Sequence, residues 1–124
     1  MAAAVAYIHR HDPAPRLLVY AGSSTFYSAL AAAPLTPLAF PPHLFDLTEH
    51  DVSRFPTRRE VERVLALHPT TVVMQEPILA IGEDREMTRL VNAYIAAHCR
   101  AGTLVTVRDM YASDFVRIST ECGA

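Results

Sequence analysis

The sequence predicts an α/β fold, with a three-layer, mostly parallel sheet and helices on both faces. Continuous apolar runs are typical of strands that are buried on both faces. Segments with helical periodicity alternate with these runs along the chain, and this alternation favours right-handed crossovers and parallel pairing. The expected central parallel strands are Leu17–Ala21, 71–74 and 104–107.

Length and composition indicate a single domain over residues 1–124, in which residues 1–15 form an N-terminal extension. Apolar residues make up 51% of the chain and charged residues 19%, as in globular proteins. The formal charge of −2 gives no argument for binding nucleic acid or an acidic membrane. Without a signal peptide or a membrane span of about 20 apolar residues, we expect a cytoplasmic protein with no membrane partner.

All 11 basic residues are arginine, so the chain has no lysine that could bind phosphate or form a Schiff base. A GC-rich genome is the simpler explanation, although an arginine-rich chain also suits a thermophile. Cys99 and Cys122 are too few and too far apart in sequence for a zinc site. Cytosolic thiols are normally free, and a Cys99–Cys122 disulfide is the alternative.

The first half of the chain begins with residues 5–9, which fit either a short strand or a helical turn. A polar loop follows over 10–15. His9, His11 and Asp12 belong to a solvated polar region or, alternatively, to a metal site; we expect no metal. After the strand Leu17–Ala21, Thr25 is expected to cap a helix over 26–33 that Pro34 ends.

The middle of the chain starts with a rigid proline-rich loop, and residues 43–47 are expected to form a short strand. Thr57 then caps a helix to His68, with Glu60 completing a capping box. The arginines of this region form a modest basic patch, which is a solvated face or, alternatively, a site for an anionic partner. They are Arg54, Arg58, Arg59 and Arg63.

The last third contains the longest predicted helix, which Asp84 caps and which ends at Ala101-Gly102. A β-branched strand follows over 103–107. Residues 115–119 alternate in polarity and are expected to form the last strand, at an edge of the sheet.

Polar residues follow the expected strands at the points where they end. Gln75 and Glu76 come after one apolar run, and Arg108 and Asp109 come after another. Ligands of open parallel sheets gather at the carboxyl ends of the strands. This edge of the sheet is therefore where we expect the functional site.

The order of these motifs over residues 16–120 resembles the core of RecA-type ATPases, the superfamily of RecA, RadA and KaiC-like proteins. Four segments carry the resemblance. Residues 19–25 match the family's phosphate-binding loop, and residues 72–76 match its acidic Walker B strand. Residues 101–106 match its helix-to-strand junction, and residues 112–118 match its last shared element.

The chain departs from the family where ATP chemistry resides. The phosphate-binding loop lacks the second glycine and the lysine of G-x-x-x-x-G-K-[ST]. Gln75 replaces the Mg²⁺-binding aspartate, while Glu76 keeps the place of the water-activating carboxylate. The resemblance thus implies a RecA-like fold that has lost ATPase activity and needs no cofactor.

The first functional hypothesis is a non-catalytic RecA-like domain that acts by protein–protein contact as an accessory factor in DNA recombination or repair. It would pair with itself, with a RecA-family protein or with DNA, although the low net charge argues against DNA binding alone.

The alternative is a small enzyme that binds a nucleotide or another phosphorylated ligand at the strand ends. Arg108 would clamp a phosphate and Glu76 would be the candidate catalytic base. The other candidate ligand-binding residues are Gly22, Ser23, Ser24, Thr25, Gln75 and Asp109.

Two apolar segments in irregular regions predict a homo-oligomer or a constitutive partner, because exposed apolar patches are usually interaction sites. Packing against the domain's own core is the alternative. The residues are Leu35, Leu38, Phe40 and Leu44 in the first segment, and Ile78, Leu79 and Ile81 in the second.

Overall fold

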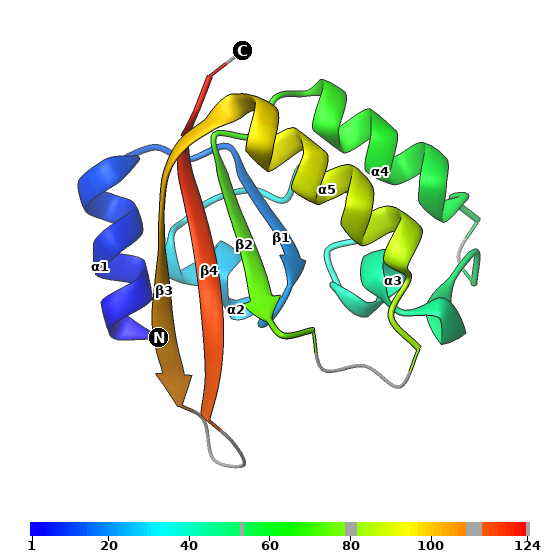
Figure 1. The fold of residues 1–124 in the computed structure, drawn as a ribbon, viewed down its shortest axis with the longest axis horizontal. Coiled ribbons are helices and arrows are strands. Elements are labelled where there is room, and N and C mark those ends of the chain that lie inside the picture. The colour runs from blue at the N-terminus through cyan, green and yellow to red at the C-terminus, as the bar shows by residue number, and fades with distance from the viewer. Residues whose placement is uncertain (53, 79–81, 109–112, 124) are drawn as a thin grey trace.

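The computed structural model describes residues 1–52, 54–78, 82–108 and 113–123 (Figure 1). Helices and strands alternate in its first part, and two long strands follow one another at its end. In chain order the elements are α1 (Ala2–His11), β1 (Leu17–Ala21), α2 (Thr25–Ala29), α3 (Pro42–Phe45), a 3-10 turn η1 (Leu47–Glu49), α4 (Thr57–Ala66), β2 (Thr71–Glu76), α5 (Arg85–His98), β3 (Cys99–Arg108) and β4 (Ser113–Cys122).

The described strands form one mixed sheet in the order β1-β2-β4-β3. β1 pairs with β2 in parallel, whereas β4 runs antiparallel to both β2 and β3. The predicted mostly parallel, RecA-like sheet is therefore wrong. Although β3 runs in the same direction as β1 and β2, it lies at an edge of the sheet with an antiparallel neighbour.

The reason for this correction lies in the last two strands. Only residues 109–112 separate β3 from β4, and parallel neighbours need a crossover of a dozen or more residues. Two long strands joined so closely pair as an antiparallel hairpin. β4 then occupies the place beside β2, and residues 115–119 lie inside the sheet rather than at its edge.

Helices cover the two faces of the sheet unequally. α3, α4 and α5 pack on one face, where Leu18, Tyr20 and Val72 contribute to a buried apolar cluster. α1 and α2 pack on the other face around Leu17 and Val19. All five residues of β1 are buried, since both of its faces are covered.

Local chemistry explains which other predictions held. The segments Leu17–Ala21 and 71–74 are confirmed as strands that pair in parallel, but the predicted central position of Leu17–Ala21 is wrong, because β1 lies at an edge of the sheet. The cap of α5 is also confirmed, because a carboxylate oxygen of Asp84 accepts a hydrogen bond from the Met87 amide.

Several expected boundaries and caps were wrong. Residues 5–9 belong to helix α1. Residues 43–45 belong to α3, because Pro42 favours the first turn of a helix, while Asp46 forms an isolated bridge to Glu83 and Leu47 begins η1. Helix α2 stops at Ala29, near Ala31 with its φ of 50°, and Thr25 is its first residue rather than its cap.

Two further predictions failed because neighbours in space determine the outcome. Thr57 does not cap α4, since its hydroxyl oxygen accepts a hydrogen bond from the Asp51 amide instead. Gly102 does not end α5. It lies inside β3, where a Cβ atom would come within 3.2 Å of the Ile118 carbonyl oxygen on β4.

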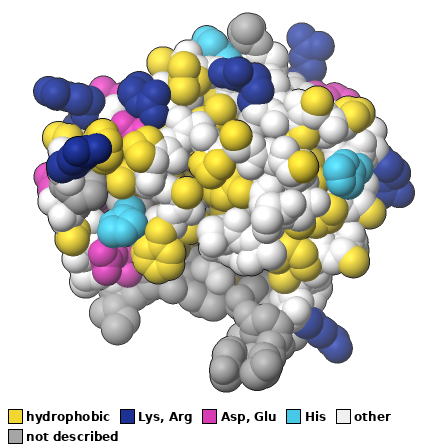
Figure 2. Space-filling view, turned by 180° about the vertical axis from the view of Figure 1, so that it is seen from behind, with side chains coloured by type: hydrophobic (Ala, Val, Ile, Leu, Met, Phe, Trp, Pro, Cys, Tyr) yellow, Lys and Arg dark blue, Asp and Glu magenta, His cyan; other side chains and the backbone are white. Residues whose placement is uncertain are grey.

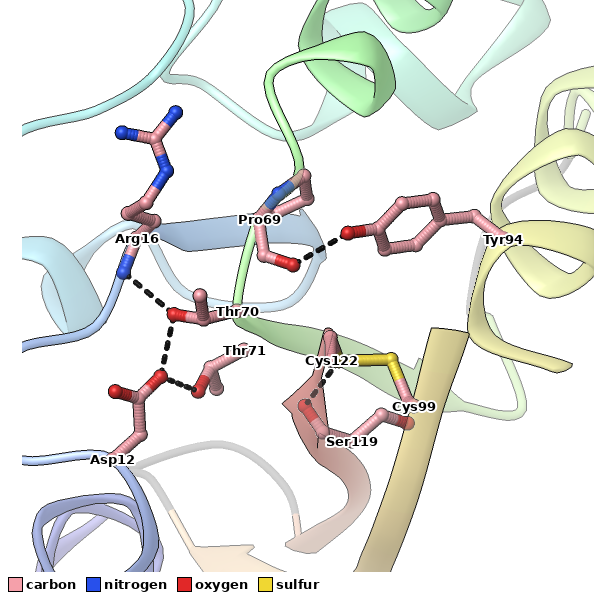
Figure 3. The surroundings of a disulfide bond; sticks show 9 residues. All are labelled: Asp12, Arg16, Pro69, Thr70, Thr71, Tyr94, Cys99, Ser119 and Cys122. Atoms are coloured by element: carbon pink, nitrogen blue, oxygen red, sulfur yellow. Dashed lines mark hydrogen bonds between the residues drawn. A yellow bond between two sulfur atoms is a disulfide. The ribbon is translucent and has the colours of Figure 1, made fainter. Parts of the chain in front are cut away.

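A disulfide joins Cys99 to Cys122, which lie opposite each other on β3 and β4 (Figure 3). The expected free thiols are thus paired. Nearby, the Tyr94 hydroxyl of α5 donates a hydrogen bond of 2.6 Å to the Pro69 carbonyl, just before β2. The Gly123 amide also donates to the His98 carbonyl. These links hold the end of α5 and the end of β4 at the same end of the sheet.

We predict that replacing both cysteines by alanine lowers the free energy of unfolding by about 3 kcal/mol, because the 23-residue separation sets the entropy that the bridge removes from the unfolded chain. Chemical denaturation of the oxidised protein and of the variant measures the difference. A reducing agent should destabilise the natural protein and leave the variant unchanged; a natural protein that is insensitive to reduction would contradict the bridge.

Candidate functional site

A cleft of about 380 Å³ opens at the carboxyl ends of β1 and β2. Its lining combines aromatic rings and prolines with a few neutral polar side chains. The lining residues are Gly22, Ser23, Ser24, Phe26, Phe40, Pro41, Pro42, Phe45, Gln75, Val107 and Val116. Its volume falls within the range of small-molecule sites in proteins.

The near wall of the cleft is the turn between β1 and α2. Gly22 has a φ of 130°, which L-residues with a side chain rarely adopt, so glycine allows the sharp exit from β1. The Ser23 hydroxyl oxygen then accepts a hydrogen bond of 3.2 Å from the Thr25 amide. Ser23 and Ser24 are exposed and line the cleft.

Strand alternation separates the two polar residues at the end of β2. Val73 belongs to the cluster under α1 and α2, and Gln75 follows it on that face and lines the cleft. Glu76 lies on the opposite face and forms an ion pair with Arg117 of β4. The candidate base therefore does not reach the cleft.

Glu76 instead borders a smaller hollow of about 140 Å³ between the end of β2 and α5. Its ion pair with Arg117 is only partly shielded, since both side chains remain more than a third exposed. Such pairs contribute little to stability. Thr88 and Asn92 of α5 form the other side of this hollow.

The far wall of the cleft is formed by the proline-rich segment and α3. This wall is held in place through Thr36, whose hydroxyl donates a hydrogen bond of 2.8 Å to the buried carboxylate of Glu60 on α4. The guanidinium of Arg63 donates to the same carboxylate and also to the Leu35 carbonyl. Hydrogen bonds from Arg63, and then from Thr36, lower the pKa of the Glu60 carboxyl below its ordinary value.

Charge is absent from the segment that builds most of this site. No residue between Arg16 and Asp46 carries a formal charge. Because α2 lies behind the sheet in Figure 1, it faces the viewer in Figure 2, where hydrophobic side chains gather in the middle of the face and arginines lie toward its rim. Phe40 stands at the cleft with 56% of its surface exposed.

The structure brings together some of the predicted site residues and separates others. Gly22, Ser23, Ser24 and Gln75 meet at the cleft, whereas Thr25 is outside its lining. Val107 lines the cleft, but the exposed Arg108 does not. Asp109 lies outside the described residues.

Sequence reasoning missed the aromatic and proline wall of the cleft. The available indication is the proline-rich segment, for which the sequence predicts an oligomer contact through Leu35, Leu38, Phe40 and Leu44. Leu38 and Leu44 of that segment are buried in the domain's own core, and Leu35 and Ile78 are partly buried against it. Leu79 and Ile81 lie outside the described residues.

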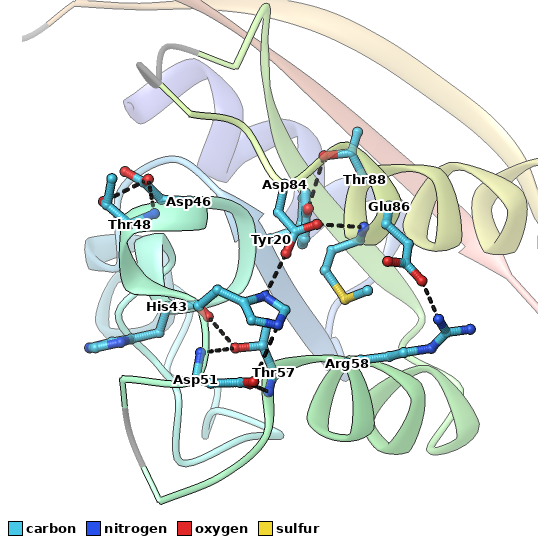
Figure 4. Close-up of polar contacts among 12 residues, drawn as sticks. Tyr20, His43, Asp46, Thr48, Asp51, Thr57, Arg58, Asp84, Glu86 and Thr88 are labelled. Atoms are coloured by element: carbon cyan, nitrogen blue, oxygen red, sulfur yellow. Dashed lines mark hydrogen bonds and ion pairs between the residues drawn. The ribbon is translucent and has the colours of Figure 1, made fainter.

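A polar cluster beside α3 holds loops in place rather than forming a reactive centre (Figure 4). His50 lies 2.8 Å from the carboxylate of Asp84, which is only 4% exposed and also caps α5. Asp51 and Thr57 exchange two hydrogen bonds between side chain and backbone. These contacts tie His50 to the start of α5 and Asp51 to the start of α4.

Tyr20 extends the same region toward the sheet, and its hydroxyl lies 2.9 Å from that of Thr88. Burial raises the pKa of the Tyr20 phenol well above its ordinary value, so the hydroxyl stays protonated.

Near the N-terminus, Asp12 accepts hydrogen bonds from Thr70 and Thr71. No group of three or more histidine, cysteine or acidic residues is placed to hold a metal within the described ranges.

Comparison of the chain with protein-family models, curated proteins and solved structures finds no match. Among the described residues, no helix is long and apolar enough to cross a membrane. The site must therefore be interpreted from its own chemistry.

We predict that Glu60→Gln lowers the free energy of unfolding by about 2 kcal/mol near pH 7. The reason is that a neutral amide accepts weaker hydrogen bonds from Arg63 and Thr36 than the charged carboxylate does. The pKa of Glu60 in the folded protein lies below its ordinary value of 4.5, so the ionised carboxylate stabilises the fold fully above pH 4.5. This stabilisation is lost as the pH falls through the folded-state pKa. The difference between the two proteins should thus shrink in acid.

Chemical denaturation of both proteins at a series of pH values from 7 to 3 provides the measurement. The exposed Glu62 of the same helix offers a matched control, and Glu62→Gln should cost much less. A Glu60→Gln difference that stays constant or grows in acid would contradict the role assigned to this carboxylate.

Proposed function

We propose that the protein is a non-catalytic binding domain whose cleft takes a small, uncharged ligand with one apolar face and several hydrogen-bonding groups. The observation that carries this proposal is that the described lining residues carry no charge. Aromatic rings and prolines offer apolar contact, while Ser23, Ser24 and Gln75 offer hydroxyl and amide groups. Small-molecule sites commonly combine these two features.

The same lining argues against catalysis at the cleft. General acid–base catalysis needs a titratable group within hydrogen-bond reach of the substrate. A serine nucleophile likewise needs an adjacent base. Among the described residues that line the cleft there is no histidine, cysteine, lysine, arginine or acid.

A phosphorylated ligand fits the cleft poorly for a related reason. Phosphate sites depend on charge-assisted hydrogen bonds from basic groups, and Arg108 is not part of the lining. The hypothesis of an accessory role in recombination depended on the RecA-like sheet. The mixed sheet removes that support, so the proposal keeps only the non-catalytic character of that hypothesis.

We also propose that the chain works in an oxidising compartment, rather than in the cytoplasm. The Cys99–Cys122 pairing supports this, since structural disulfides are rare where thiols are kept reduced. Alkylation of the protein in freshly acid-quenched cells should label neither cysteine before reduction. Labelling of both would contradict this proposal.

We predict that neutral ligands bind better than their phosphorylated counterparts. Matched pairs, such as a nucleoside with its monophosphate and a sugar with its phosphate, can be titrated while backbone amide NMR shifts are followed. Shifts should concentrate at Gly22, Ser23, Ser24 and the Gln75 side chain. Tighter binding of the phosphorylated members would contradict the proposal.

A variant that fills the cleft provides the control for location. Ser24→Trp places a large ring at the lining and should abolish the binding of any neutral ligand found. Ser28→Trp, at an exposed position of α2 and outside the lining, should leave that binding unchanged. Equal effects of the two substitutions would argue against the cleft as the site.

A further inference from the structure

The outer edge of β3 is an unusually long free strand edge. β3 has ten residues, and its pairing with β4 continues without a register shift from Cys99 to Arg108. Typical strands have about five or six residues. Within the part of the chain that the structure describes, no strand pairs with the other side of β3.

This edge lacks most of the devices that block edge-to-edge pairing. Proteins usually protect edge strands with prolines, bulges, short lengths, charges along the strand, or a covering helix or loop. Helix α1 lies beside β3 and packs on the face that carries Val105 and Val107 (Figure 1). β3 has no proline, no acidic residue and no bulge, and its charged residues are Arg100 and Arg108 alone. The stretch 102–107 between them is uncharged and rich in β-branched residues.

The face next to this edge is also open. Leu104 of β3 and Phe115 of β4 are 58% and 55% exposed. In Figure 1, α4 and α5 lie over the β1 and β2 side of the sheet, and the lower parts of β3 and β4 extend away from them. A strand added to β3 would place alternate side chains against Leu104.

Charge decides which partner suits the edge. An antiparallel pairing of β3 with a second copy of itself, at full overlap, places Arg100 of each copy opposite Arg108 of the other. Like charges directly opposite each other destabilise a sheet. Shifting the register relieves the repulsion but leaves part of each strand unpaired. Acidic residues at these two positions would instead meet both arginines.

We propose that the outer edge of β3 binds an extended segment of a partner protein that is uncharged and rich in β-branched residues at its centre and acidic at both ends. The segment adds an antiparallel strand to the sheet. Its two acidic residues stand eight positions apart, which matches the spacing of Arg100 and Arg108. Backbone hydrogen bonds supply affinity, and the two charge pairs fix the register. This inference does not depend on the ligand of the cleft.

The test uses a nine-residue peptide of alternating threonine and valine with glutamate at both ends, and a second peptide with lysine at both ends. Binding is followed by amide NMR and by hydrogen exchange of the full chain. The glutamate peptide should slow exchange of the outward amides of β3 and should bind at least tenfold more tightly than the lysine peptide.

Charge reversal on the protein provides the matched control. Arg100→Glu with Arg108→Glu should reverse the preference between the two peptides. Arg85→Glu with Arg89→Glu changes the net charge equally at exposed positions of α5 and should leave the preference unchanged. Because all four arginines are exposed, each variant should fold, which circular dichroism checks.

Three outcomes would overturn the proposal. They are no protection of β3 by the glutamate peptide at millimolar concentration, equal binding of the two peptides, and a preference that the β3 reversal leaves unchanged. Sedimentation of the protein alone tests the competing occupant, because self-association that protects the β3 amides would assign this edge to a second copy.

Discussion

The pairing of β2 on both of its sides is the interaction on which the rest of the structure depends. Thr71, Val72, Val73 and Met74 are buried on both faces, in parallel pairing with β1 and antiparallel pairing with β4. The two apolar clusters form on opposite sides of this strand. Its position also determines which side chains reach the cleft, because alternation sends Gln75 to one face and Glu76 to the other.

The two ends of the sheet have different chemistry. At the end where β1 and β2 begin, Asp12 accepts a hydrogen bond from Thr70 and Tyr94 donates one to Pro69. Together with the disulfide, these contacts join helices to strands. At the opposite end the strands open onto a neutral cleft between aromatic and proline walls. A well-anchored sheet that presents a cleft at one end suits a binding site, since ligand-contacting groups are best held by rigid elements.

The sequence predicted what depends on neighbours along the chain. The buried strands β1 and β2 follow from apolar runs, and the start of α5 follows from the capping residue Asp84. Contacts distant in sequence could not be predicted in the same way. The direction of β4 depends on its hairpin with β3, and the arrangement at Thr57 depends on Asp51. Part of the site was predicted, because the ends of the expected strands located Gly22 and Gln75. The strand ends gave no indication of the wall of the cleft that contains Phe40.

The mixed pairing of β2 is tested most directly by NMR contacts between strands. Antiparallel neighbours bring some opposite Cα atoms to about 4.5 Å, which gives strong contacts between their α-hydrogens, while parallel neighbours give none of comparable strength. The account predicts such contacts between β2 and β4, within the paired positions from Val72–Ser119 to Glu76–Phe115. It predicts none between β1 and β2. Strong contacts between β1 and β2, or β2 paired directly with β3, would contradict it.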